Sequence, residues 1–257
     1  MTAIDASTPV RRSSPQAAVL RSEARLFLRE PGMLFWTMGF PPVLLIILGS
    51  IPSFRKVDDG LGVRLIDVYV PVLVMVALIV TGLQAMPPLI TGYRERGILR
   101  RMSTTPVRPS ALLTAQMALF GATGLSSALL CMAIGRIAFD VKLPGQIGGY
   151  VLALLLTAIA ALALGALVSA RARTARIATA FGMAAFFPSL FSAGLWLPVQ
   201  TMPHALQKIV EALPFGAAVR ALDQAAAGHW PSWSHLGVLA AWAIVLSAAA
   251  ARWFRWE

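Results

Sequence analysis

Three histidines and a pair of aspartates are the residues whose types could do acid–base chemistry or bind a metal. His204, His229 and His235 all lie in residues 198–235, the last loop between apolar runs, and no cluster of cysteines or further histidines accompanies them. Asp58 and Asp59 are followed directly by a glycine, which is typical of a solvated turn rather than of paired carboxylates. We therefore expect no catalytic residue and no metal site.

The motif for phosphate chemistry is also missing from the sequence. The only lysines are Lys56, Lys142 and Lys208, and none stands in a Gly-x-x-x-x-Gly-Lys-Ser/Thr loop, so the chain is not expected to hydrolyse ATP. The single cysteine, Cys131, lies inside an apolar run and is expected to be a small buried hydrophobe. The sequence predicts that this chain is no enzyme and binds no cofactor.

One charged segment between two apolar runs has the composition of a docking surface. Residues 92–109 read Gly-Tyr-Arg-Glu-Arg-Gly-Ile-Leu-Arg-Arg-Met-Ser-Thr-Thr-Pro-Val-Arg-Pro. Tyr93–Met102 fits a short basic helix, which Thr104-Thr105-Pro106 would end because the residue before a proline disfavours the helical region. Such a helix could dock into a groove on a soluble partner. On composition alone, the alternative is a loop whose arginines only fix membrane topology.

The elements that carry these residues are predicted to be membrane helices. The chain has 257 residues, of which 58% are hydrophobic and 13% charged, whereas soluble domains have about 25% charged residues. The net charge of +11 does not indicate nucleic-acid binding, because the basic residues sit in short loops between apolar runs. Six runs are long enough, or nearly so, to cross a hydrocarbon core of about 30 Å, and they are Met33–Ile51, Val68–Ile90, Ala111–Gly135, Ile147–Ser169, Ile177–Leu197 and Leu236–Ala251. The predicted fold is an all-α polytopic membrane protein with six transmembrane helices.

The distribution of positive charge predicts the orientation of these spans. With the N-terminus inside, the cytoplasmic segments hold 15 Lys and Arg residues and the outer segments hold 7. The protein is therefore expected in the cell (inner) membrane with both termini in the cytoplasm and with residues 52–67, 136–146 and 198–235 outside. None of the spans has an Asp, Glu, His or Lys in its interior, which argues against proton-coupled transport.

Two further segments are amphipathic but too short to span the membrane. In Gln16–Glu30, apolar residues share one helical face and arginines another, which predicts an interfacial helix within a cytoplasmic tail of residues 1–32. The six-span domain would then be residues 33–257. In its external helical loop, residues 198–235, apolar residues between Pro203 and Pro214 follow a helical period, which predicts a short re-entrant helix. A second such helix is predicted at Phe215–Ala227.

The order of residues in 92–109 resembles a known motif. The segment is similar to the Glu-Arg/Lys-Gly-Thr-Leu-x-x-Leu-x-x-Thr-Pro-Val loop of the type-two ABC exporter permeases, the drug-resistance and polysaccharide-export family. Ile98 replaces the usual Thr and Met102 the usual Leu. A second resemblance, after span five, lies in Gly194-Leu-Trp-Leu-Pro198 with Met202-Pro203, Leu213-Pro214 and Arg220. The likeness runs from about residue 16 to the C-terminus.

The resemblance implies the permease subunit of an ATP-driven ABC exporter, similar to the daunorubicin-resistance-type membrane subunits. Its cargo would be a lipophilic or amphiphilic compound. Partners would be a second permease, in a homo- or heterodimer, membrane lipids, and a nucleotide-binding ATPase subunit that holds ATP and Mg²⁺. The loop would be the coupling helix, with the matching residues Arg94, Glu95, Arg96, Gly97, Leu99, Arg100, Thr104, Thr105, Pro106 and Val107. The alternatives are a membrane scaffold or assembly factor without transport, or a polysaccharide or lipid exporter subunit of the same family.

Polar and aromatic residues inside spans two and five are the candidates for lining a substrate pathway. They are Thr81, Gln84, Phe186, Phe187, Ser189, Phe191 and Ser192. The alternative is ordinary helix–helix packing, in which hydroxyls bond across or along helices and phenyl rings fill gaps.

Overall fold

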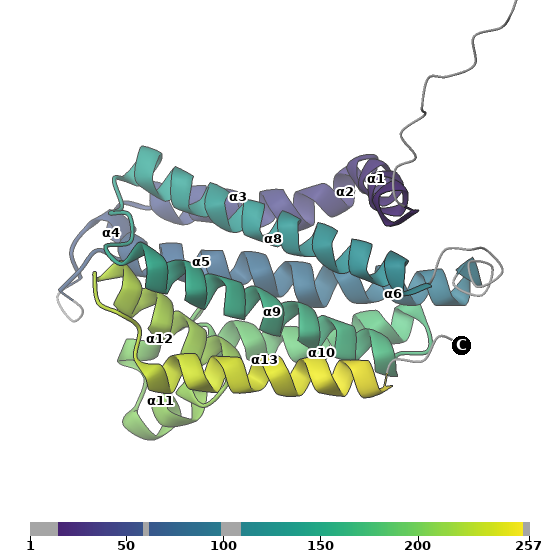
Figure 1. The fold of residues 1–257 in the computed structure, drawn as a ribbon. Coiled ribbons are helices and arrows are strands. Elements are labelled where there is room, and N and C mark those ends of the chain that lie inside the picture. The colour runs from purple at the N-terminus through teal and green to yellow at the C-terminus, as the bar shows by residue number, and fades with distance from the viewer. Residues whose placement is uncertain (1–14, 59–61, 99–108, 254–257) are drawn as a thin grey trace, which may run out of the picture.

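The structure, a computed structural model, describes residues 15–58, 62–98 and 109–253 (Figure 1). Within these ranges every regular element is a helix, and six helices are long and apolar enough to cross a membrane. These spans are Pro31–Ser50, Leu65–Glu95, Leu112–Phe139, Ile147–Arg171, Ala175–Ser192 and Trp233–Trp253. The prediction of an all-α, six-span membrane protein is confirmed.

The first two spans share an unusual interruption. The first consists of α2 (Pro31–Leu34), the π-helical segment η1 (Phe35–Gly39) and α3 (Phe40–Ser50). The second consists of α5 (Leu65–Ile79), the π-helical segment η2 (Val80–Ala85) and α6 (Met86–Glu95). Each π-helical segment is followed by one residue and then by two consecutive prolines. Proline has no N–H, so the carbonyls four residues earlier lose their helical donor and the helix widens locally.

One of these freed carbonyls finds a donor on another span. Met38 precedes Pro42 by four residues, and its carbonyl oxygen accepts a hydrogen bond of 3.1 Å from Ser127 Oγ. Ser127 is fully buried in α8 (Pro109–Phe139), the third span. This bond satisfies a polar group that lipid could not, which explains a serine in the middle of an apolar helix.

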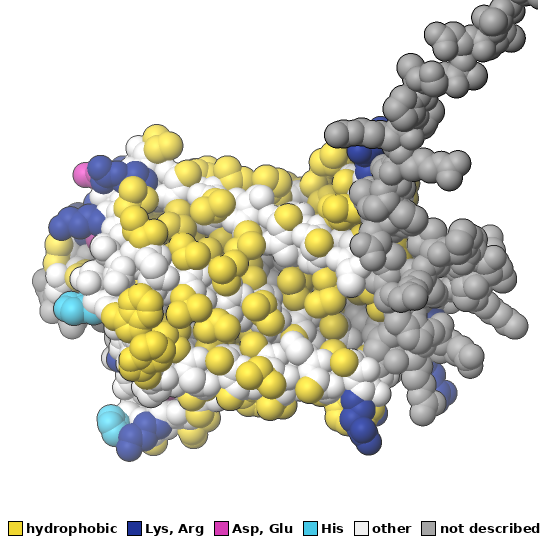
Figure 2. All heavy atoms as spheres, viewed as in Figure 1, with side chains coloured by type: hydrophobic (Ala, Val, Ile, Leu, Met, Phe, Trp, Pro, Cys, Tyr) yellow, Lys and Arg dark blue, Asp and Glu magenta, His cyan; other side chains and the backbone are white. Residues whose placement is uncertain are grey.

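The second span lies at the centre of the bundle (Figure 1). It packs against α3 and α8 on one side and against α9 (Ile147–Arg171) and α10 (Ala175–Ser192) on the other. α9 also packs along α13 (Trp233–Trp253), the last span. We refer to the end of the bundle where α6, α9 and α13 stop as the α6 end. Hydrophobic side chains spread over the middle of the face formed by α8, α9 and α13, and basic side chains gather near both ends (Figure 2).

The fifth span is shorter than the sequence pattern predicted. α10 begins after Thr174, whose Oγ1 accepts a hydrogen bond from the Ile177 N–H, and ends at Ser192. The predicted end at Leu197 is wrong, because Gly194 takes a left-handed conformation with φ 81° that stops the helix.

Both predicted short helices between spans five and six are present. α11 (His204–Glu211) lies at the end of the bundle opposite the α6 end, which we call the α11 end (Figure 1). α12 (Pro214–Ala226) packs against α9 and α13, with Phe215, Ala218 and Leu222 fully buried or nearly so. Two shorter helical pieces, α4 (Pro52–Arg55) and η3 (Val199–Thr201), lie in the described connections after the first and fifth spans.

The predicted N-terminal helix is present as α1 (Pro15–Leu28). It packs on α8 at the α6 end. Phe27 is buried there, and its ring meets that of Phe120 edge-on at a centroid distance of 5.6 Å. One face of α1 is therefore committed to the bundle, and Leu26 and Leu28 remain exposed.

Candidate functional site

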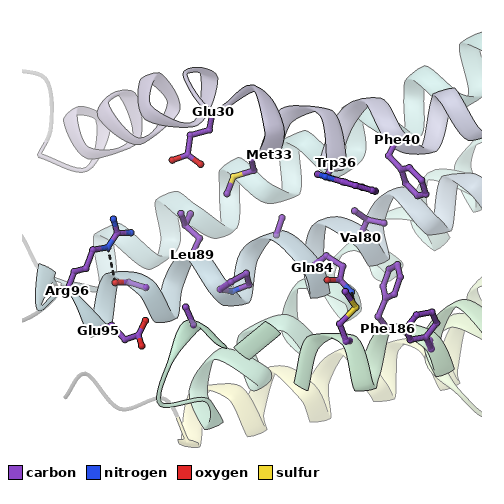
Figure 3. A pocket seen from close by; sticks show the side chains of 16 residues that line it. Glu30, Met33, Trp36, Phe40, Val80, Gln84, Leu89, Glu95, Arg96 and Phe186 are labelled. Carbon is purple, nitrogen blue, oxygen red and sulfur yellow. Dashed lines mark hydrogen bonds between the residues drawn. The ribbon is translucent and has the colours of Figure 1, made fainter. Parts of the chain in front are cut away.

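A cavity of about 770 Å³ opens between the first two spans and α10 (Figure 3). Trp36 and Phe40 form its wall on the first span, and Phe186 and Phe187 form the wall on α10. The floor comes from the second span and includes Gln84, Val80 and Leu89. This size and an apolar lining with few polar groups are typical of small-molecule sites.

The two π-helical segments build the inner part of this cavity. Trp36 belongs to η1, while Val80, Gln84 and Ala85 belong to η2. The two segments contact each other. A π-helical turn changes which side chains face a neighbour, and such turns often occur at functional sites. Both apolar runs carry a Pro-Pro pair, Pro41-Pro42 in the middle of the first and Pro87-Pro88 near the end of the second, and these pairs were the sequence signal that could have marked the site.

Glycines hold the floor of the cavity against α9 and α10. A methyl group on Gly165 of α9 would collide with the carbonyl oxygen of Gly82, and one on Gly182 of α10 would collide with that of Leu83. Leu83 is four residues before Pro87 and so has no helical donor at that position. The close approach of the two glycines fixes η2 between both helices.

Charged side chains stand at the mouth of the cavity, at the α6 end. Glu30, Glu95 and Arg96 line it there (Figure 3). Arg96 Nε donates a hydrogen bond of 3.1 Å to the carbonyl oxygen of Gly92, and its guanidinium lies 5.6 Å from the centre of the Tyr93 ring. The cavity therefore joins an aromatic interior to a charged mouth.

Glu23 of α1 ties three elements together beside this mouth. Its Oε2 accepts hydrogen bonds from Tyr93 Oη at 2.8 Å and from Gln116 Nε2 at 2.6 Å. These donors come from α6 and α8. Sequence reasoning missed Glu23, because an acid on the polar face of an amphipathic helix looks solvated and its partners are 70 or more residues away.

Arg94 links the end of α6 to the end of α9. Its Nη1 donates to the carbonyl oxygens of Ser169 and Ala172, each at 3.1 Å. These groups belong to the last turn and the C-cap of α9, where carbonyls lack helical donors and a cation is favoured. A movement of the α6 end would therefore act on α9 directly.

The prediction of a separate basic helix over Tyr93–Met102 is wrong in its first part. Tyr93, Arg94 and Glu95 form the last turn of α6, continuous with the second span, and Gly97 ends that helix with φ 63°. The remaining motif positions, Leu99, Arg100, Thr104, Thr105, Pro106 and Val107, lie outside the described residues. The coupling role of the segment stays a prediction.

The structure brings only some of the predicted pathway residues together. Gln84, Phe186 and Phe187 line the cavity, and Gln84 Nε2 lies 3.1 Å from Met183 Sδ. Thr81, Ser189 and Ser192 are buried instead, and each hydroxyl donates to a carbonyl of its own helix, those of Ala77, Ala185 and Ser189. Phe191 is on the outer surface of α10, 36% exposed. The wall from the first span, Trp36 and Phe40, was missed.

A second group of polar side chains lies at the α11 end, where α11, α12 and α13 meet. Glu211 Oε1 lies 2.9 Å from Arg220 Nε, and Glu211 Oε2 lies 3.9 Å from His235 Nε2. Asp223 accepts a hydrogen bond from Gln200. Burial raises the pKa of Asp223 from 3.8 to about 7, against the opposing effects of Arg220 and Gln200.

Comparison with known protein families identifies this architecture. The family model described as ABC-2 type transporter matches residues 17–226, from α1 to the end of α12. No curated protein matches the chain significantly. The matched region includes five of the six spans, the cavity and the end of α6. The chain belongs to the ABC-2 type transporter family, as a membrane-spanning permease.

Proposed function

We propose that this permease exports a lipophilic or amphiphilic compound, driven by ATP hydrolysis in a separate nucleotide-binding subunit. The observation that carries the proposal is the position of the cavity. Beside Glu30, its mouth is lined by Gly92, Glu95 and Arg96, which belong to the first part of the segment that resembles a coupling loop. Its floor is the same continuous span. A displacement of the loop would therefore change the shape of the cavity.

The lining favours an amphiphile over a polysaccharide. Four aromatic rings and two methionines, Met33 and Met183, face the interior, where Gln84 is the polar side chain. A sugar polymer would leave many hydroxyls without hydrogen-bond partners in such a cavity, and each buried unpaired hydroxyl is costly. An apolar compound loses nothing by the transfer.

Contacts at the α6 end support mechanical coupling. Arg94 connects α6 to α9, and Glu23 connects it to α1 and α8. An ATPase subunit that pushes on residues 92–109 would therefore move α6 together with three other helices. Two π-helical segments next to Pro-Pro pairs give both spans a place to bend.

In this proposal the α6 end is cytoplasmic, with both termini inside an inner or plasma membrane. A second permease, the same chain or a related one, would close the open side of the cavity. Large apolar side chains are exposed on the two elements that wall the cavity, including Phe35 and Ile47 on the first span and Phe181 and Phe187 on α10. Lipid or a second permease would cover them.

Copurification tests the assignment. The tagged permease, expressed in its native host, should retain a nucleotide-binding ATPase subunit through affinity and size-exclusion steps. The complex should hydrolyse ATP, and the permease alone should not. Hydrolysis by the isolated permease would overturn the proposal. So would failure of the ATPase to associate and to be stimulated in lipid.

A further inference from the structure

We propose that the cavity selects amphiphilic organic cations, with the apolar body among the aromatic rings and the positive charge toward Glu30 and Glu95. The inference rests on the proposed function, because it names the chemical class of compound for the same cavity. It goes beyond that function in assigning a charge to the compound and a recognition role to two carboxylates.

The aromatic part of the cavity is suited to a cation with a broad apolar body. The rings of Trp36 and Phe40 lie 5.1 Å apart on one wall, and those of Phe186 and Phe187 lie 5.7 Å apart on the other. Ring faces attract a positive charge, and tryptophan does so most strongly. Met33 and Met183 can adapt to differently shaped ligands because their side chains are flexible and polarizable.

The two carboxylates at the mouth are the unusual feature. The described residues of the α6 end include three acids, Glu23, Glu30 and Glu95. Glu23 is held by its two hydrogen bonds. For Glu30 and Glu95, no side-chain hydrogen bond or ion pair to another described residue is present, and both line the cavity. Both are exposed, so a cation that reaches the mouth would meet them.

Arg96 does not reverse the charge of this mouth. Among the described lining residues it is the single basic group, against two acids. Its guanidinium is engaged with its own helix, through the Gly92 carbonyl and the face of Tyr93. An anion would have to compete for this group and approach two carboxylates. Among the described lining residues the balance of charge is therefore negative, in a protein whose net charge is +11.

A pair of ions of equal shape and opposite charge tests the proposal. The full-length permease is placed in nanodiscs of phosphatidylcholine, and binding of tetraphenylphosphonium and tetraphenylborate is measured by equilibrium dialysis, with empty nanodiscs subtracted. We expect saturable binding of the phosphonium that weakens as salt is raised, since added ions screen exposed charges. We expect no saturable binding of the borate.

Substitutions locate the site. Glu30→Gln and Glu95→Gln should each raise the Kd for the phosphonium about three- to fivefold, and both together about tenfold, while removing most of the salt dependence. The control is Asp140→Asn, an exposed acid at the α11 end whose left-handed φ of 52° asparagine also accepts. It should bind like the wild type.

Equal binding of both ions would overturn the proposal, as would a double variant that keeps its affinity and salt dependence. Either result would show an apolar groove filled by lipid or by a second permease. The outcome is separable from that of the copurification test. Selective phosphonium binding by a permease that associates with no ATPase would contradict the proposed exporter function and support the cation site. An active complex with the ATPase that shows no preference for the phosphonium would support the exporter function and overturn the cation site.

Discussion

At the scale of single residues, a few side chains connect the helices at the α6 end of the bundle. Arg94 satisfies two carbonyls at the end of α9, and Arg171 of the same helix end stacks on Trp253 with its guanidinium 4.2 Å from the ring centre. The first of these residues belongs to the motif of residues 92–109. Its structural role is therefore measurable without any transport assay.

We expect Arg94→Ala to destabilise the permease by about 1.5–3 kcal/mol, the typical contribution of hydrogen bonds to a charged group. The change leaves the Ser169 and Ala172 carbonyls without this donor. Thermal unfolding in detergent, followed by loss of the monodisperse peak, measures the effect. Arg173→Ala, at an exposed position after α9, is the matched control and should melt like the wild type. Equal melting of both variants would contradict the assigned role of Arg94.

Asp223 predicts a pH dependence of stability. Its pKa is raised from 3.8 to about 7 in the folded protein, so between these values the folded state holds a proton that the unfolded state has lost. The contribution of this group is therefore most favourable below about pH 4, falls as the pH rises, and levels off above about pH 7. Melting temperatures between pH 5 and pH 8 should decrease in the wild type. Asp223→Asn should reduce that decrease, and Asp140→Asn should not.

At the scale of elements, the two π-helical segments and the glycines around them define the middle of the bundle. Pro41-Pro42 and Pro87-Pro88 remove helical donors at matching places in the first two spans. Ser127 donates to one freed carbonyl, and Gly182 packs on another. The interruptions are thus supported by neighbouring helices, as irregular backbone within a membrane must be.

Gly165→Ala should disrupt this arrangement, because the new methyl group would collide with the carbonyl oxygen of Gly82. Overpacking of this kind costs about 1–3 kcal/mol, and more where the backbone must shift. The comparison variant is Gly237→Ala in α13, where a methyl group would meet open space. It should be neutral or slightly stabilising, since alanine favours helix over glycine. Melting temperatures of the two variants should differ clearly. Similar values would show that η2 is not clamped by α9.

At the scale of the whole molecule, the arrangement makes a definite topological prediction. Single cysteines at Asp59, Gln146 and Gln207, in a Cys131→Ala background, should react with an impermeant thiol reagent in intact cells. A cysteine at Ser103 should react only after the membrane is opened. The expectation follows from the excess of Lys and Arg in the segments assigned to the cytoplasm. Labelling at position 103 with protection of the other three positions would show the opposite orientation in the membrane and contradict the exporter assignment.

The sequence by itself determined the six spans, the N-terminal helix and both short helices of the loop after span five. The physical reason is that these features are local. Whether a segment spans the bilayer depends on the length of its own apolar run, and the helical period of a short amphipathic segment can be read from consecutive residues. The motif of residues 92–109 was likewise readable as an ordered string.

Only the tertiary structure decided which side chains share a cavity. Gln84 faces it and Thr81 does not, although both lie in the same π-helical segment. In a membrane span, apolar side chains surround the whole helix, so hydrophobicity does not mark the face that meets a neighbour. The contacts of Glu23 and Arg94 join residues 70 to 93 positions apart. Such contacts depend on how the helices pack. Lipid is as favourable a neighbour for apolar side chains as another helix is, so close packing and polar contacts determine how the helices are arranged.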